Sequence, residues 1–139
     1  QKFLRDSIDN QLVSSAHDIS EGGFAVSLAE CCIASGLGAH IYLPNNVSRI
    51  DRLLFAEGGA RILVSISSSK LNQWKAALEK TNLGFDSEFA QQIGVVTAEK
   101  TLVIEQKGKN LLQLPLSELA KSFDTAISRR VEINKAGIR

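Results

Sequence analysis

Apolar and polar positions alternate in blocks between residues 12 and 34, and these blocks organise the chain. An apolar run that begins at Leu12 and Val13 predicts a short buried strand. A polar turn follows it and ends in the glycine pair Gly22-Gly23. The next stretch, Phe24–Ala34, is apolar at almost every position and predicts a helix that is covered on most sides. The pattern therefore predicts a strand, a turn and a helix in succession.

The remaining pattern alternates helix and strand signals along the chain. An amphipathic helix is predicted over Lys2–Asn10, and a short helix or turn over Arg52–Gly59 leads into a second glycine pair. Lys107-Gly108-Lys109 is a hairpin signal between two strands. Further strands are predicted at 39–43, at 61–66 as a central strand, and at 92–96, where Gly94 marks either a bulge or a close-approach point. Strands are also predicted at 101–105 and 110–114, and further helices at 70–80 and after Pro115. This order predicts an α+β fold in which helices pack on a mixed, mostly antiparallel sheet.

Length and composition favour one domain over residues 1–139, with a disordered tail over 132–139. The sequence is 44% hydrophobic and 22% charged, which is typical of a globular protein. No run is long enough to span a membrane and no signal peptide is visible, so a cytoplasmic location is expected. A net charge of +1 gives no general attraction to nucleic acid or to a membrane surface. Because the chain contains no methionine and opens inside a predicted helix, we expect it to be a piece of a longer polypeptide.

Two residue types that often carry chemistry have simple structural interpretations here. Cys31 and Cys32 are adjacent on an apolar helix, where neighbours point about 100° apart. They are therefore expected to be buried small apolar residues and not a metal site. Trp74, the only tryptophan, is expected to lie in the core because it shares a predicted helix face with Leu71 and Leu78.

The turn before the apolar helix carries residues that suit a phosphate group. A strand that runs through a glycine-rich turn into a helix directs backbone N–H groups outward, and the helix dipole favours an anion there. Gly22 and Gly23 would let a ligand approach the backbone closely. Asp18 and Glu21 add carboxylates that fit a hydrated Mg²⁺ shared with phosphate oxygens, and Ser20 could donate to a phosphate oxygen.

A purely structural interpretation of the same turn stays open. Ser20, Asp18 and Glu21 are also ordinary capping residues and dipole partners, and glycine in such turns often serves packing alone. The spacing is not that of a Walker A loop or of a dinucleotide fingerprint. For His17, at the end of a buried strand, we expect its ring to hydrogen-bond the turn, which favours a structural or orienting role over that of a general base.

Three segments together resemble one known family. Ala16–Gly23 followed by Ala25–Glu30 resembles the His-Asp-x-Ser-(Asp/Glu)-Gly-Gly segment of the aminoimidazole ribonucleotide (AIR) synthetase superfamily. Leu54–Arg61 is similar to the second hallmark of that superfamily, Leu-Phe-x-Glu followed by Arg and a strand, and Ile93–Val96 is similar to its Ile-Gly-x-Val strand. The resemblance runs from about Leu12 to Val131. Within the superfamily, the spacing is most similar to the last domain of the phosphoribosylformylglycinamidine synthases.

The resemblance implies a domain of an ATP-dependent ligase of purine biosynthesis. Such enzymes convert formylglycinamide ribonucleotide, ATP and glutamine-derived ammonia into the amidine. The resemblance places a Mg²⁺ contact on Asp18 and a nucleotide-phosphate contact on Ser20, beside the glycine pair Gly22-Gly23. It places the catalytic histidine and most nucleotide contacts in other domains, so no catalytic residue is expected in this chain. The site near Asp18 is then an auxiliary nucleotide site or part of the turnover site.

The resemblance also implies partners and leaves alternatives open. The expected partners are the remaining domains of the same polypeptide, and a glutaminase subunit and a small subunit if the parent is the short bacterial form. Gly58-Gly59 departs from the usual pair after Glu57, which favours a supporting role for residues 55–59; His17 and Glu21 are further supporting candidates. The alternatives are another ATP-using member of the superfamily, such as selenide water dikinase or a hydrogenase maturation factor, and a non-catalytic interaction module.

Overall fold

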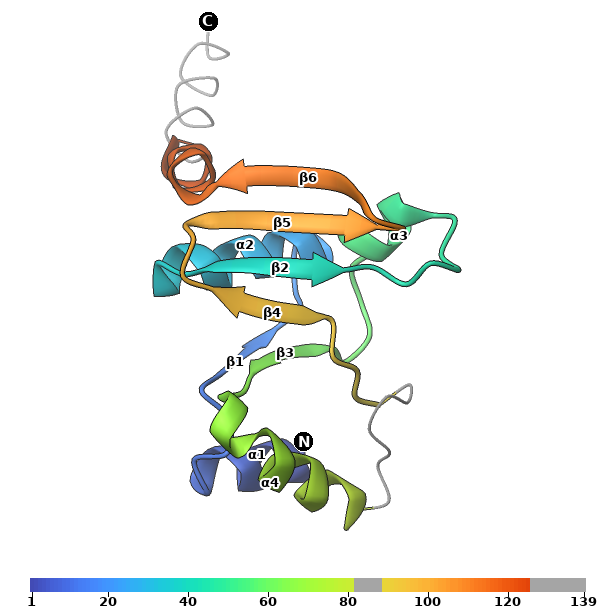
Figure 1. Ribbon diagram of the computed structural model, residues 1–139, viewed down its shortest axis with the longest axis vertical. Helices are drawn as coiled ribbons and strands as arrows, with labels where there is room; N and C mark the ends of the chain where they lie inside the picture. The colour runs from blue at the N-terminus through green and yellow to red at the C-terminus, as the bar shows by residue number, and fades with distance from the viewer. Residues whose placement is uncertain (82–88, 126–139) are drawn as a thin grey trace, which may run out of the picture. The chain divides into compact units, whose positions relative to one another are not determined.

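The computed structural model describes residues 1–81 and 89–125, and these form helices and short strands (Figure 1). Their order is α1 (Lys2–Asp9), β1 (Ser15–Asp18), α2 (Gly23–Ser35), β2 (Gly38–Tyr42), α3 (Ile50–Phe55), β3 (Ile62–Ser65), α4 (Ser68–Glu79), β4 (Gly94–Thr97), β5 (Thr101–Gln106) and β6 (Lys109–Pro115). Residues 116–125 are helical, as the apolar spacing after Pro115 predicts. The predicted tail over 132–139 lies outside the described residues.

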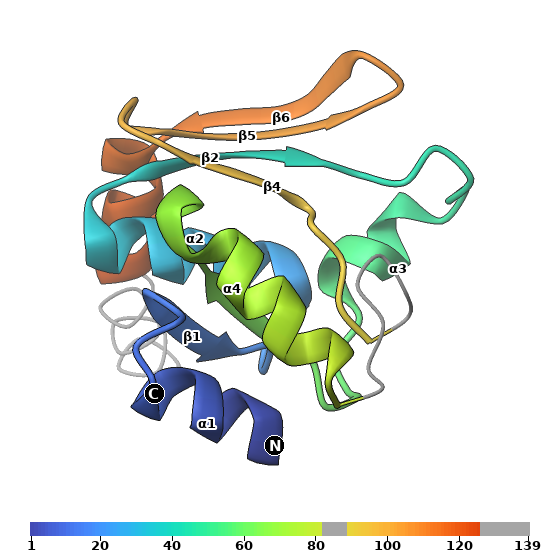
Figure 2. The ribbon, with the colours of Figure 1, turned by 60° about the horizontal axis from the view of Figure 1, so that its bottom comes forward.

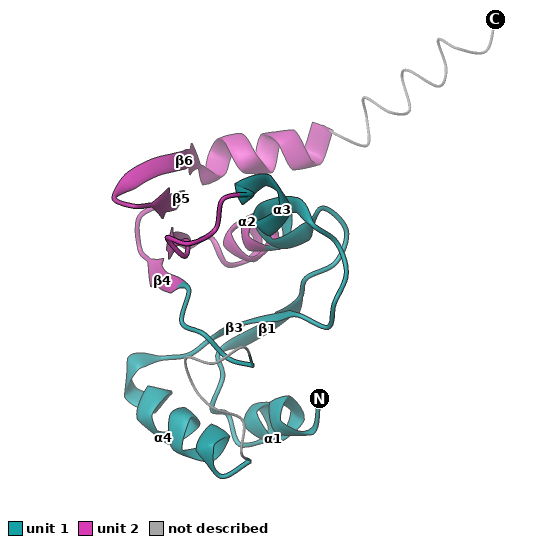
Figure 3. Cartoon of the chain, turned by 90° about the vertical axis from the view of Figure 1, so that its right-hand side faces the viewer, with its two compact units in different colours: residues 1–27, 49–93 teal, residues 28–48, 94–139 magenta. Residues whose placement is uncertain are grey.

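The chain forms two compact units, and each unit is built from two separate stretches (Figure 3). Unit 1 consists of residues 1–27 and 49–93, and unit 2 of residues 28–48 and 94–139. The assignment of residues 1–139 to one domain stays a prediction.

Unit 1 holds a two-stranded antiparallel sheet and two helices that share a core. β1 pairs with β3 in a register that sets Asp18 opposite Ile62. The core cluster contains Leu12, Trp74 and Leu78, and the ring of Phe3 from α1 meets the indole of Trp74 edge-on at 5.6 Å between centroids. This contact joins α1 to α4, and it confirms the prediction that Trp74 is a core residue.

Two predictions about the strands of unit 1 are wrong. Leu12 and Val13 lie between α1 and β1 and not in a strand, because Gln11 turns with a φ of 54° and the Leu12 N–H donates to the carbonyl of Ser7. β1 begins only at Ser15, and three of its four residues are exposed. β3 is not central either, because within the described residues it pairs with β1 alone. The apolar residues of β3 are half-buried or exposed, and β-branched residues favour strands at such positions as well as in a buried centre.

Unit 2 holds a four-stranded sheet of order β4-β2-β5-β6. β2 and β5 are parallel and the other two pairs are antiparallel, which confirms the predicted α+β class with a mixed, mostly antiparallel sheet. One face is buried through alternate residues such as Ile41, Leu102 and Ile104, and residues 28–35 of α2 run along the sheet (Figures 1 and 2). A Cβ at Gly94 would overlap the carbonyl oxygen of His40, so the predicted close approach at this glycine is confirmed.

The β5–β6 hairpin turns through Lys107 and Gly108, which both have positive φ (52° and 72°), as a two-residue hairpin turn of this hand requires. The buried amide of Gln106 donates to the carbonyl of Pro44 at 2.7 Å and to that of Val47 at 3.0 Å. These two bonds attach the segment after β2 to the end of β5.

The burial of the cysteines agrees with the expectation from the sequence. Cys32 is buried, Cys31 is half-buried, and neither forms a disulfide. Burial raises the pKa of the Cys32 thiol to about 11, since a thiolate would lose its hydration there. Among the helices of the described residues, none is long and apolar enough to cross a membrane.

Candidate functional site

The chain leaves β1 and enters α2 through a tight turn at residues 19–23. The Ile19 N–H donates to the carbonyl of Arg61 at 2.9 Å, which extends the β1–β3 pairing by one bond. The Gly23 N–H then donates to the carbonyl of Ser20 at 3.1 Å. Gly22 and Gly23 both lie in the left-handed region, with φ of 80° and 72°, which glycine adopts far more readily than other residues. The predicted strand–turn–helix order is therefore present.

A second segment, residues 55–61, lies against this turn. The Gly22 N–H donates to Oε1 of Glu57 at 2.9 Å. A Cβ built on Gly23 would stand 2.7 Å from the carbonyl carbon of Phe55 and 3.0 Å from the carbonyl oxygen of Ala56. Nη2 of Arg61 donates to that same Ala56 oxygen at 2.7 Å, which ties the segment back to the start of β3. We call residues 55–61 the bracing segment.

These contacts correct one step of the phosphate-site prediction. A strand–turn–helix order predicts unpaired N–H groups at the glycine pair, but the Gly22 N–H donates to a carboxylate and the Gly23 N–H to the Ser20 carbonyl. The acceptor of the Gly22 bond lies 35 residues further along the chain, so no local pattern could reveal it. The partner of Gly22 is nevertheless an anion, as the dipole argument predicts for a helix N-terminus.

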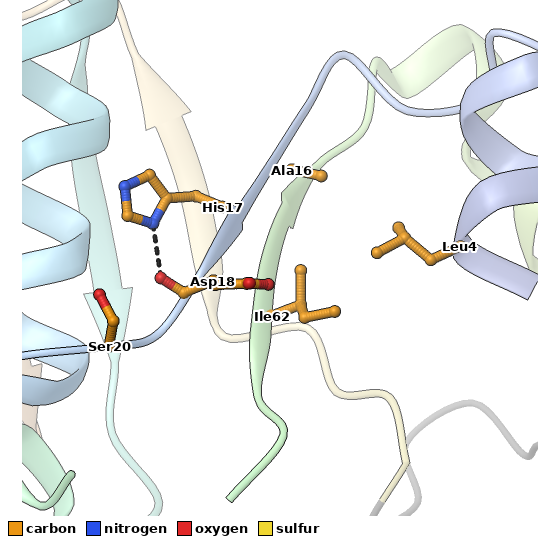
Figure 4. A pocket seen from close by; sticks show the side chains of 6 residues that line it. All are labelled: Leu4, Ala16, His17, Asp18, Ser20 and Ile62. Carbon is orange, nitrogen blue, oxygen red and sulfur yellow. Dashed lines mark hydrogen bonds between the residues drawn. The ribbon is translucent and has the colours of Figure 1, made fainter. Parts of the chain in front are cut away.

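His17, Asp18 and Ser20 line one open hollow of about 420 Å³ in unit 1 (Figure 4). The other lining residues are Leu4, Ala16 and Ile62. Nδ1 of His17 lies 2.7 Å from the carbonyl oxygen of Asp18, so the imidazole is bound to the start of the turn. The predicted hydrogen bond of the ring to the turn is present, although His17 lies within β1 and the strand is largely exposed; the orienting role stays a prediction.

The Asp18 carboxylate projects from the opposite side of β1, as expected of strand neighbours. Figure 4 shows it directed toward Ile62, while the Ser20 hydroxyl lies on the side of His17. Within the described residues, neither the Asp18 carboxylate nor the Ser20 hydroxyl has a hydrogen-bond partner. The predicted capping of α2 by Ser20 is therefore not observed, and both polar groups face solvent.

An exposed carboxylate with free oxygens fits Mg²⁺, which keeps several waters and often takes only one or two carboxylates together with substrate phosphates. The described residues contain no group of three or more His, Cys, Asp or Glu side chains that could hold a metal ion. Asp18 can therefore supply one ligand, and phosphate oxygens, water or other polypeptide must supply the rest. Glu21 is exposed on the turn, and Glu57 is engaged with Gly22.

Gly22 is a less selective probe of ligand approach than the sequence implies. A Cβ at this position would lie 2.6 Å from Cγ2 of Val26 in the first turns of α2. A Gly22→Val change would therefore strain the helix as well as block a ligand, and Asp18 is the better position for a test.

The chain belongs to the family of AIR synthase related proteins, of which it matches the C-terminal domain. Residues 1–107 match the family model of the AIR synthase related protein, C-terminal domain. The chain is thus a member of this domain family, as its sequence motifs predict.

Within that family, the chain is similar to one particular protein. It is 52% identical over 135 residues to the phosphoribosylformylglycinamidine synthase subunit PurL of Prochlorococcus marinus strain MIT 9313, an alignment that covers 96% of this chain and 17% of that protein. The structure is similar to Thermotoga maritima PurL complexed with ATP (TM-score 0.69, 19% identity) and complexed with FGAR (TM-score 0.68, 21% identity). Each of these two structural alignments covers 86% of this chain and 20% of the PurL chain. The chain therefore spans about a sixth of the length of the curated relatives it matches.

Proposed function

We propose that this chain is the C-terminal domain of a phosphoribosylformylglycinamidine synthase. The observation that carries the proposal is the 52% identity to PurL across 96% of the chain. The enzyme would convert formylglycinamide ribonucleotide, ATP and ammonia from glutamine into the amidine, with release of ADP and phosphate. This identity favours that assignment over selenide water dikinase, a hydrogenase maturation factor or a non-catalytic module.

In this proposal the turn after β1 serves a nucleotide and supplies no catalytic group. Asp18 would contribute one carboxylate to a Mg²⁺ that neutralises the nucleotide phosphates, which is the chemistry such an ion supplies when bound. Ser20, Gly22 and Gly23 would contact phosphate, and His17, Glu21 and Glu57 would support the turn. Asp18 and Ser20 both line one hollow, and their polar side-chain groups have no hydrogen-bond partner among the described residues, which supports these roles.

The proposed partners are the other domains of the same polypeptide, and separate glutaminase and small subunits if the parent is of the short form. A cytoplasmic location follows from the proposed pathway. Isolated from its partners, the chain would be inactive, because the groups that act on the substrate would lie in other domains.

A domain replacement tests the proposal. In the PurL subunit of strain MIT 9313, the 135 matched residues are exchanged for this chain; we call the product the PurL chimera. Amidine and ADP are measured with ammonium chloride as the nitrogen donor. We expect ATP-dependent amidine formation by the chimera and none after deletion of the domain. A chimera with the thermal stability of the parent that forms no amidine would contradict the proposal.

The residue roles are tested in the same chimera. Asp18→Asn should weaken Mg·ADP binding at this site by about tenfold or more, since loss of even an indirect metal partner costs that much. Asp9→Asn removes an exposed carboxylate of α1 and is the matched control, which should bind like the unmodified chimera. Equal binding by the two variants would assign the turn a purely structural role.

A further inference from the structure

The Gly22 N–H already binds an anion that belongs to the protein itself. Its hydrogen bond to Oε1 of Glu57 is 2.9 Å long, a normal distance for an N–H donor and a carboxylate. A backbone N–H carries one hydrogen and makes one strong bond. A phosphate oxygen and the Glu57 carboxylate therefore cannot both accept from Gly22.

The two sides of Glu57 differ in how closely the backbone is packed. On the N-terminal side, the Ala56 carbonyl accepts from Arg61 and the Phe55 backbone lies against Gly23. On the C-terminal side, the Gly59 carbonyl accepts from the Arg61 N–H at 2.9 Å. Gly58 and Gly59 have φ of 103° and 76°, and a Cβ at either would meet no atom of the described residues within 4 Å. No packing contact thus demands glycine at these two positions. Glu57 itself is exposed, so its side chain can leave Gly22 for solvent without disturbing a core.

From this geometry we infer that Glu57 is a built-in competitor of the phosphate ligand at Gly22. Without ligand, the Glu57 carboxylate accepts the hydrogen bond of the Gly22 N–H. When a nucleotide phosphate binds, the carboxylate is displaced and the bracing segment stays in place through Ala56 and Arg61. Phosphate then binds less tightly than it would to a turn without Glu57, because the free energy of the Glu57 hydrogen bond is lost when phosphate binds. The inference rests on the proposed phosphate contact of Gly22.

If Glu57 competes with phosphate, its removal should raise the affinity of the site for the ligand. Removal of a residue that only supports the turn should lower that affinity. A net hydrogen bond in proteins is worth about 0.5–1.5 kcal/mol, which corresponds to about twofold to tenfold in an equilibrium constant. Glu57→Ala should therefore tighten Mg·ADP binding by about that factor. Glu57→Gln keeps a weaker acceptor of the same length, and it should give a smaller gain.

The experiment is isothermal titration of the PurL chimera with Mg·ADP. The Asp18→Asn chimera identifies which part of the isotherm belongs to this site. Glu79→Gln, which removes an exposed carboxylate of α4 in the same unit, controls for the change in net charge. We expect the affinity to rise in the order Glu79→Gln, Glu57→Gln, Glu57→Ala.

The outcomes separate the two claims. If Asp18→Asn weakens binding and Glu57→Ala leaves it unchanged or weaker, Glu57 is no competitor and the inference is wrong, while the nucleotide site stands. If Asp18→Asn leaves the isotherm unaltered, the proposed site fails first and the inference fails with it. Gains of equal size for Glu79→Gln and Glu57→Ala would assign the effect to net charge and would also overturn the inference.

Discussion

Replacement of Gly23 by alanine tests how closely the bracing segment and the turn are packed. Gly23 has a φ of 72°, and its Cβ would lie 2.7 Å from the carbonyl carbon and 2.8 Å from the Cα of Phe55. These are backbone atoms, so no side-chain rotation relieves the overlap. Gly59 is the matched control in the same unit, because it has a φ of 76° and nothing within 4 Å of the position of a Cβ.

The two substitutions share one free-energy cost and differ in the other. A left-handed conformation costs a non-glycine residue about 1–2 kcal/mol, and this applies to both alanine variants. Forcing an extra carbon into a packed site costs about 1–3 kcal/mol more, and this applies to Gly23→Ala alone. We therefore expect Gly23→Ala to lower the free energy of unfolding by about 2–5 kcal/mol and Gly59→Ala by about 1–2 kcal/mol.

Urea denaturation of the chain, followed by tryptophan fluorescence, measures the difference. Trp74 is the only tryptophan and lies in the core of unit 1, so its emission reports on the unit that contains both glycines. With a urea dependence of about 1–3 kcal/mol per molar, a difference of about 2 kcal/mol separates the midpoints by roughly 1 M. Equal midpoints for the two variants would refute the close backbone contact.

Three further expectations concern His17, the isolated chain and the cysteines. In the PurL chimera, His17→Asn should keep most of kcat, because the ring binds a backbone carbonyl; a loss of several hundredfold would indicate catalysis. The isolated chain should unfold cooperatively but form no amidine, and measured ATP-dependent amidine formation would contradict this. Burial holds the pKa of the Cys32 thiol at about 11, above its ordinary 9.0, so the thiol of the unfolded chain ionises at a lower pH. The free energy of unfolding measured in urea titrations should therefore fall as the pH rises from 9 toward 11. Cys32→Ser should reduce this dependence on pH.

Local patterns account for most of the helices and for the hairpin. The helix that begins at Gly23 follows from an apolar run after a glycine pair, and the Lys107-Gly108 turn follows from the need for positive φ. Both depend on residues that are near one another in the sequence. The hydrophobic pattern places the start of β1 too early, because the apolar residues Leu12 and Val13 pack in the core from a segment that is not a strand.

The candidate site was predictable in part. His17, Asp18 and Ser20 were identified from the turn and from the family motif, and they line one hollow. The bond between Gly22 and Glu57 was not predictable, because it depends on how β3 returns antiparallel to β1 and brings the preceding segment to the turn. Free N–H groups were inferred from a general property of helix ends, whereas tertiary contacts decide which of them are satisfied.

The discontinuity of both units has a consequence for how the chain folds during synthesis. β2 is complete at Tyr42, but its parallel neighbour β5 begins only at Thr101, and residues 49–93 of unit 1 lie between them in the sequence. The ribosome must therefore release most of the chain before the sheet of unit 2 can close, and β2 stays an open strand edge until then. Because each unit is split, no single truncation yields either one; a chain that begins at residue 28 and joins residue 48 directly to residue 94 contains unit 2 alone.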